Sequence, residues 1–195
     1  MHKVWSGVFL CMYIAISIQY LFFYSVQHFL WICSLVVLFG IGALWSKSSI
    51  WITGLFLITI PLSIPYTINA VSLVLFGSPV FAYVTDYLLT ASLFERVVSA
   101  YHIITLIVLG RYAWSKPSPR GWLISSGVFL FAVGTSLLLP TQYNINFVRS
   151  EFLHIVFHSW YSMALASLAV AGVFFALNTG IVFLKEKINK QTRDK

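Results

Sequence analysis

The chain has 195 residues, of which 59% are hydrophobic and 17% aromatic, and only 9% carry a charge. Soluble domains carry about 25% charged residues, so this chain cannot cover a water-facing surface and is expected to be an integral membrane protein. The net charge of +7 could suggest nucleic acid as a partner. The basic residues instead lie at span ends and in a tail without interleaved aromatic side chains, which argues against nucleic-acid binding.

Long apolar segments predict an all-α bundle of transmembrane helices. The segments are about 20 residues long and lack a period of two, which favours helices over a barrel. The first segment is too long for a signal-peptide core, and no small-residue cleavage site follows it, so we expect it to be retained. Six spans are predicted, at residues 4–24, 29–45, 49–65, 96–114, 121–139 and 159–184. They form one transmembrane domain over 1–184, followed by a basic cytoplasmic tail over 185–195.

The segment between the third and fourth spans is partly apolar but irregular. Pro61 and Pro65 are expected to kink or end the third span. Residues 66–76 are too short to cross a bilayer, so we interpret them as an interfacial or re-entrant element. A turn is predicted at residues 77–79. Residues 80–93 are also too short for a seventh span.

The distribution of basic residues predicts the orientation. With the N-terminus inside, ten of the twelve lie on the cytoplasmic side, and only Arg96 and Arg149 lie outside. The positive-inside rule then places both termini in the cytoplasm. Because the tail would lie near anionic headgroups, membrane lipids are the expected partners.

This orientation gathers the remaining polar residues at the outer face, His28 and His102 among them. In the stretch "RSEFLHIVFHSW", helical spacing places Glu151, His154 and His158 on one face. Two imidazoles and a carboxylate could hold zinc, with an open position for a reactive water. The alternative is an interfacial helix whose polar side chains meet lipid headgroups.

The stretch "FERVVSAYH" places Arg96, Ser99 and His102 on one helix face. Ser99 and His102 lie about one turn inside the apolar region, where polar side chains face the bundle interior. They suggest a nucleophile and its base, or an interhelical hydrogen bond. His102 could also ligate metal or, with His154 or His158, hold haem b between facing helices. Arg96 is expected to anchor a phosphate or carboxylate.

Further polar residues complete the expected binding set. Asn144 and Asn146 follow a proline, and their amides can orient a ligand or satisfy backbone groups. Asp86 could pair with Arg96 or Arg149, orient a histidine, or cap the helix that follows it. We expect these side chains to converge at the outer face.

A stripe of small residues marks the last span. Gly172, Ala176 and Gly180 are spaced four apart. Such spacing lets membrane helices approach closely. The stripe predicts packing within the bundle or between protomers, so a second copy of the chain or another membrane protein is an expected partner.

The motifs "TDYLLTASLFERVVSAYH" and "PTQYNINFV" resemble a family of small bacterial polytopic membrane proteins whose activity is not characterised. The resemblance covers about residues 60–150 and implies that the protein lies in a bacterial inner membrane. This chain departs from the family in the basic turn, "GRYAWSKPSPRGW", which lacks the family's Asp, and in Tyr101, where the family has Phe. The residues on the motif positions are Asp86, Tyr87, Arg96, Ser99, His102, Asn144 and Asn146.

A second similarity is to the seven-span zinc hydrolases of the alkaline ceramidase and adiponectin-receptor group. They share a Ser and a His in one span and two His residues four apart in a late span. This chain lacks their Asp in the span that follows the Ser–His span. Three functions therefore stay open. The outer cluster binds a lipid headgroup, small molecule or partner, or the chain is a metal-dependent lipid hydrolase, or it is a small transporter or channel subunit.

Overall fold

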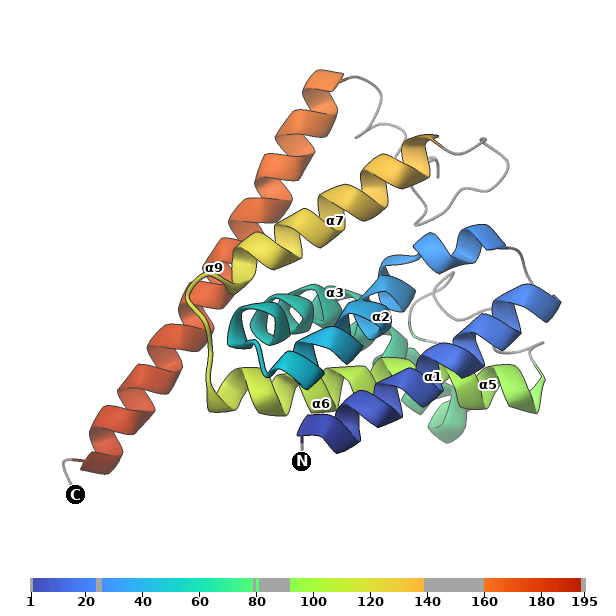
Figure 1. The fold of residues 1–195 in the computed structure, drawn as a ribbon, viewed down its shortest axis with the longest axis horizontal. Coiled ribbons are helices and arrows are strands. Elements are labelled where there is room, and N and C mark those ends of the chain that lie inside the picture. The colour runs from blue at the N-terminus through green and yellow to red at the C-terminus, as the bar shows by residue number, and fades with distance from the viewer. Residues whose placement is uncertain (1, 24–25, 79, 81–91, 139–159, 194–195) are drawn as a thin grey trace.

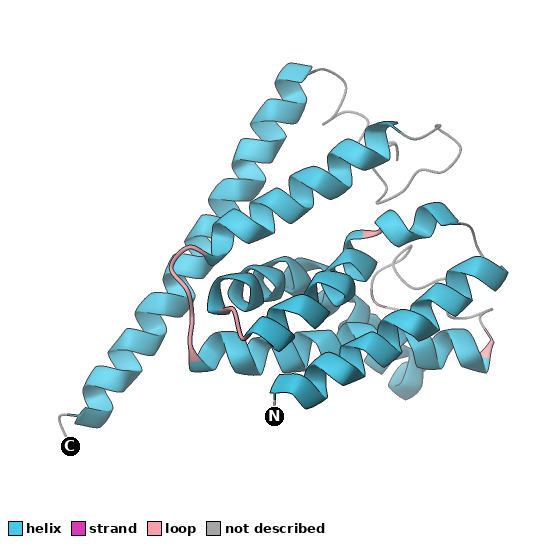
Figure 2. Ribbon diagram, in the orientation of Figure 1, coloured by secondary structure: helices cyan, strands magenta, loops and turns pink. Residues whose placement is uncertain are grey.

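The computed structural model describes residues 2–23, 26–78, 80, 92–138 and 160–193. These residues form helices joined by short loops, without a strand among them (Figure 2). The predicted all-α class is therefore confirmed. In chain order the elements are α1 (His2–Phe23), the 3-10 helix η1 (Val26–Leu30), α2 (Ile32–Ser46), α3 (Ser49–Phe76), α5 (Leu93–Ser99), α6 (Tyr101–Ser115), α7 (Gly121–Leu138) and α9 (Trp160–Arg193).

Four segments are long and apolar enough to cross a membrane, namely His2–Phe22, Ser49–Leu73, Leu93–Ser115 and Leu165–Arg193. Two apolar helices are shorter, Ile32–Ser46 and Gly121–Thr135. Large apolar side chains such as Phe22 and Leu168 are left exposed on the helix surfaces. Since so much exposed apolar surface is incompatible with water, the chain has the helices of an integral membrane protein.

The third helix is longer than predicted. Pro61 and Pro65 lie inside α3, which continues to Phe76 and ends where Gly77 adopts a φ of 72°. The expectation that residues 66–76 form a separate interfacial or re-entrant piece is therefore wrong. Membrane helices tolerate proline because neighbouring helices and local adjustments satisfy the freed backbone groups, and α3 packs along both α6 and α7. Glycine then ends the helix because it adopts a positive φ without strain.

The helices pack in an order that places α3 at the centre. It lies against α2, α6 and α7, while α1 packs on α2 and α9 packs on α7 (Figure 1). One hydrophobic core runs through α1, α2, α3, α6 and α7 and includes Phe174 of α9. Most of the remaining surface of α9 is exposed, so α9 is an outlying helix held along one edge.

Both described ends of the chain and two of its loops lie toward the same end of the bundle (Figure 1). The loops are residues 47–48, between α2 and α3, and 116–120, between α6 and α7. We call this the basic end, because it carries Lys3, Lys47, Lys116 and Arg120. The end of α1, η1 and the start of α5 lie toward the opposite end (Figure 1).

The small-residue stripe of the last span is not used for packing within the described part of the chain. A Cβ added at Gly172 or Gly180 would meet no atom within 4 Å. The side chains that hold α9 lie on another face and include the buried Phe174 and Asn178. Packing between protomers stays a prediction.

Candidate functional site

The break between α5 and α6 positions two of the predicted site residues. A capping box begins α5, in which Glu95 N donates to Ser92 Oγ at 3.3 Å and Ser92 N donates to Glu95 Oε2 at 2.8 Å. Ala100 then ends α5 and precedes α6. Beside this junction Ser99 is only 4% exposed and Tyr101 only 7%. The junction therefore turns its polar side chains into the bundle.

These side chains line a pocket of about 200 Å³ away from the basic end. The opposing walls come from the end of α1 and from η1 and the residue that follows it. We call it the histidine pocket. Its lining residues are Gln19 and Tyr20 of α1, His28 and Trp31, and Ser99, Tyr101 and His102.

His102 is held between two tyrosine rings. Its ring centroid lies 4.4 Å from that of Tyr66 and 4.2 Å from that of Tyr101, with interplanar angles of 27° and 25°. Within the described part of the chain, these stacking contacts are the only interactions of its ring, and no hydrogen bond reaches either nitrogen. A neutral imidazole has one N–H donor and one acceptor nitrogen. His102 therefore keeps both groups for a ligand or water.

His28 is fixed in a similar way on the other side of the pocket. Its ring is nearly parallel to that of Trp31, with centroids 5.8 Å apart and an interplanar angle of 17°. It also lies 5.5 Å from the ring of Tyr20. The Tyr20 hydroxyl is in turn hydrogen-bonded to Ser34 Oγ at 2.8 Å, in a buried position. The α1–α2 packing thus determines where His28 sits.

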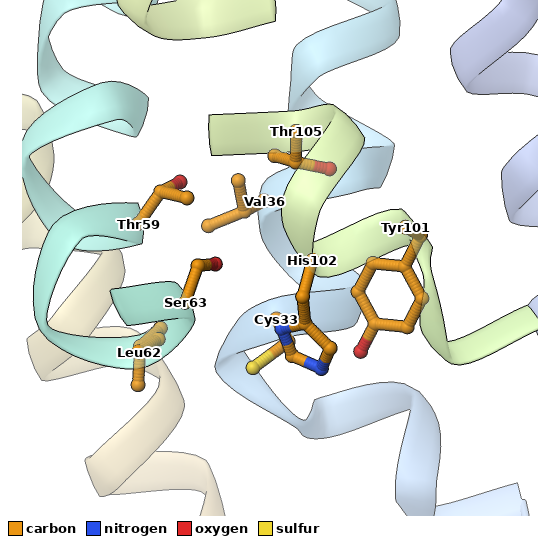
Figure 3. Close-up of a pocket in the computed structure, with 8 residues that line it drawn as sticks. All are labelled: Cys33, Val36, Thr59, Leu62, Ser63, Tyr101, His102 and Thr105. Carbon is orange, nitrogen blue, oxygen red and sulfur yellow. The ribbon is translucent and has the colours of Figure 1, made fainter. Parts of the chain in front are cut away.

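A second, smaller cavity is also lined by His102 (Figure 3). It measures about 10 Å³, close to the space that one water molecule needs. The cavity shares Tyr101 and His102 with the histidine pocket and adds Thr59, Ser63 and Thr105, among others. The buried Thr105 Oγ1 has no hydrogen-bond partner among the described residues. His102 therefore lines both a ligand-sized pocket and a small cavity of about the size of one water molecule.

The structure brings together only some of the residues that the sequence singled out. Ser99 and His102 line one pocket, as their spacing predicted. Arg96 is exposed on α5 and does not line that pocket. The other predicted residues lie outside the described part of the chain: Asp86, Asn144, Asn146, Arg149, Glu151, His154 and His158.

The zinc and haem predictions depend on those undescribed residues, so they stay predictions. Over the described ranges, no three His, Cys, Asp or Glu side chains are grouped closely enough to hold a metal. The nucleophile–base prediction needs a hydrogen bond between Ser99 and His102. In the described structure His102 makes only its stacking contacts.

Sequence reasoning placed His28 at the outer face but gave it no role, and it missed the aromatic partners. Trp31 follows His28 by three residues in "HFLW", and Tyr20 lies near the end of a long apolar run. Aromatic residues at the end of a span are usually interpreted as interfacial anchors. That interpretation gives no indication that they also line a pocket. The proximity of His28 and Trp31 was the available signal.

The part of the histidine pocket's lining that the structure describes is uncharged. No Lys, Arg, Asp or Glu is found among the lining residues that the structure describes. The pocket is lined by five aromatic or imidazole side chains and a few other hydrogen-bonding groups, which is the usual composition of a small-molecule pocket.

Comparison with known proteins adds no relative to this picture. No protein-family model, curated protein or solved structure matches the chain. The assignment of function therefore depends on the pocket itself.

Proposed function

We propose that this protein is a polytopic inner-membrane protein that binds a small, uncharged molecule in the histidine pocket, in the outer half of the bilayer. One observation carries the proposal. Two imidazoles from separate elements, His28 and His102, line the same pocket, and ring stacking holds each of them in place. Prearranged polar groups in an apolar pocket reduce the entropic cost of binding.

The proposed orientation has both termini in the cytoplasm and six spans, with the shorter α2 and α7 also crossing. Basic residues at the end that holds both termini support it. Two lysines there lie over tryptophan rings, Lys3 over Trp45 at 5.2 Å and Lys185 over Trp114 at 5.9 Å. Tryptophan rings are typical of the headgroup level of a membrane. In this orientation the histidine pocket belongs to the outer half.

The uncharged lining favours a neutral ligand over an anionic lipid headgroup. A phosphate would be bound by Arg or Lys side chains, and Arg96, the nearest candidate in sequence, lies outside the lining. A buried charge without a partner costs several kcal/mol, roughly. A neutral molecule with hydrogen-bonding groups avoids this cost.

The proposal is tested by extracting bound molecules from the purified protein and identifying them by mass spectrometry. His102→Phe and His28→Phe keep a ring for stacking but remove the nitrogens. Loss of a buried hydrogen bond costs about 1–3 kcal/mol, so we expect each variant to retain about tenfold less ligand.

His2→Phe is the matched control. The His2 ring also contacts a tyrosine ring, with its centroid 4.0 Å from that of Tyr112 and an interplanar angle of 32°, but it lies at the basic end. We expect this variant to keep its ligand. Equal ligand retention by the wild type and both pocket variants would overturn the proposal.

A further inference from the structure

We infer that the ligand of the histidine pocket is a flat, uncharged, lipid-soluble ring that carries carbonyl oxygens, which is the chemistry of a quinone head group. The inference rests on the proposed function and narrows its ligand class. It follows from the size of the pocket, the shape of its walls and the type of its hydrogen-bonding groups.

The volume fits one substituted ring. A cavity of about 150 Å³ is large enough to hold benzene, and the histidine pocket measures about 200 Å³. The difference leaves room for small substituents such as two oxygens. A porphyrin, with four linked rings, needs a much larger space.

The walls favour a flat ligand. His28 and Trp31 form one nearly parallel pair of rings, at 17°, and Tyr101 and His102 form another, at 25°. Flat aromatic walls stack best on a flat ring, with the rings offset or edge to face. Saturated, puckered ligands gain less from such surfaces.

The hydrogen-bonding groups favour carbonyl acceptors. The neutral ring of His102 can donate one N–H, and no group in the described part of the chain accepts it. His28 of η1 lines the pocket from another element, so the donor of His102 faces a pocket with imidazole rings in two of its walls. A quinone presents carbonyl oxygens on opposite sides of its ring and has no charge.

The same geometry disfavours a cationic headgroup. A cation in a site removed from water is costly unless an opposite charge lies beside it. No carboxylate is found among the described lining residues to balance a positive charge. Phosphocholine is therefore a useful competing probe.

The test titrates the purified, detergent-solubilised protein with a short-chain ubiquinone and with menadione, and follows tryptophan fluorescence, since Trp31 lines the pocket. We expect saturable quenching for the wild type and for His2→Phe. The Kd should rise about tenfold in His102→Phe. His102→Gln, whose amide can still donate, should recover part of the affinity, and this variant guards against a folding defect in His102→Phe.

Three outcomes would overturn the inference: no saturable quenching by either quinone, quenching that is the same in His102→Phe as in the wild type, or displacement of the quinone by phosphocholine. The extraction experiment separates this inference from the proposed function. If the wild type holds a His102-dependent molecule of another class, only the ring assignment fails. If no His102-dependent molecule is found, both fail.

Discussion

Two buried polar side chains fasten the loop between α6 and α7. Thr53 Oγ1 of α3 accepts a hydrogen bond from Ser118 N at 3.0 Å, and Asn178 Nδ2 of α9 donates to Pro119 O at 2.8 Å. Thr53 is 0% exposed and Asn178 only 1%. Buried hydrogen bonds are costly to leave unmade, so this short loop ties α3, α7 and α9 together at the basic end.

We expect Thr53→Val to destabilise the protein by about 1–3 kcal/mol, because the Ser118 N–H loses its buried acceptor while the side-chain shape is kept. Thermal unfolding in detergent measures the effect. Thr59→Val is the matched control on the same helix, since the Thr59 hydroxyl donates only to the Leu55 carbonyl of its own α3, at 2.7 Å. Equal losses in the two variants would contradict the assigned role of Thr53.

For single residues, the sequence indicated which polar side chains line a site, but it did not indicate which buried side chains form hydrogen bonds between helices. Ser99 and His102 were identified because they are polar within an apolar run, and both line the histidine pocket. Thr53 and Asn178 were not identified. Their partners lie 65 and 59 residues away along the chain, and only the folded bundle brings such positions together.

The crossing of α3 and α7 depends on two glycines. A Cβ at Gly54 would lie 2.5 Å from Ile124 Cβ and 2.6 Å from the Gly121 carbonyl oxygen. A Cβ at Gly121 would lie 2.6 Å from Thr53 Cγ2. Membrane helices commonly use small residues where their backbones approach closely.

We expect Gly54→Ala to destabilise the protein by about 1–3 kcal/mol, because the added methyl group meets a backbone oxygen that cannot move aside. Gly127→Ala on α7 is the control, since nothing lies within 4 Å of a Cβ there. It should be neutral or stabilising by up to about 1 kcal/mol, because alanine is the better helix former. A stable Gly54→Ala protein would show that the two helices can separate without cost.

Element positions were well predicted and element lengths less so. Every predicted span overlaps a helix of the structure. The length of α3 was predicted wrongly, because Pro61 and Pro65 were expected to end the span, whereas the helix continues through both. Packing against α6 and α7 outweighs the tendency of proline to end a helix, and such packing cannot be read from the residues around a proline.

For the whole molecule, the proposed orientation predicts which residues a membrane-impermeant maleimide can reach. In a background with Cys11→Ala and Cys33→Ala, we expect Arg96→Cys to be labelled in intact cells. Lys190→Cys should be labelled only after lysis, because the basic end faces the cytoplasm. Both positions are exposed in the fold, so burial cannot explain a difference. The reverse pattern would overturn the orientation and place the histidine pocket in the inner half.

The sequence predicted the membrane class, but it could not predict the pocket. Charge and hydropathy are sums over the chain, so they need no tertiary information. The pocket needs η1 to fold back so that His28 and Trp31 come opposite α6. No spacing along the chain encodes that arrangement.

The length of α9 has a consequence beyond anchoring. Its 34 residues make a rod of about 51 Å, whereas the hydrocarbon core of a bilayer is about 30 Å thick. Asn178 is hydrogen-bonded to the loop at the basic end, so in the proposed orientation the helical turns from Lys185 to Arg193 would extend beyond the membrane into the cytoplasm as a rigid helix. Because this helix is rigid, any change in the tilt of α9 would displace its C-terminal end, together with any protein bound there.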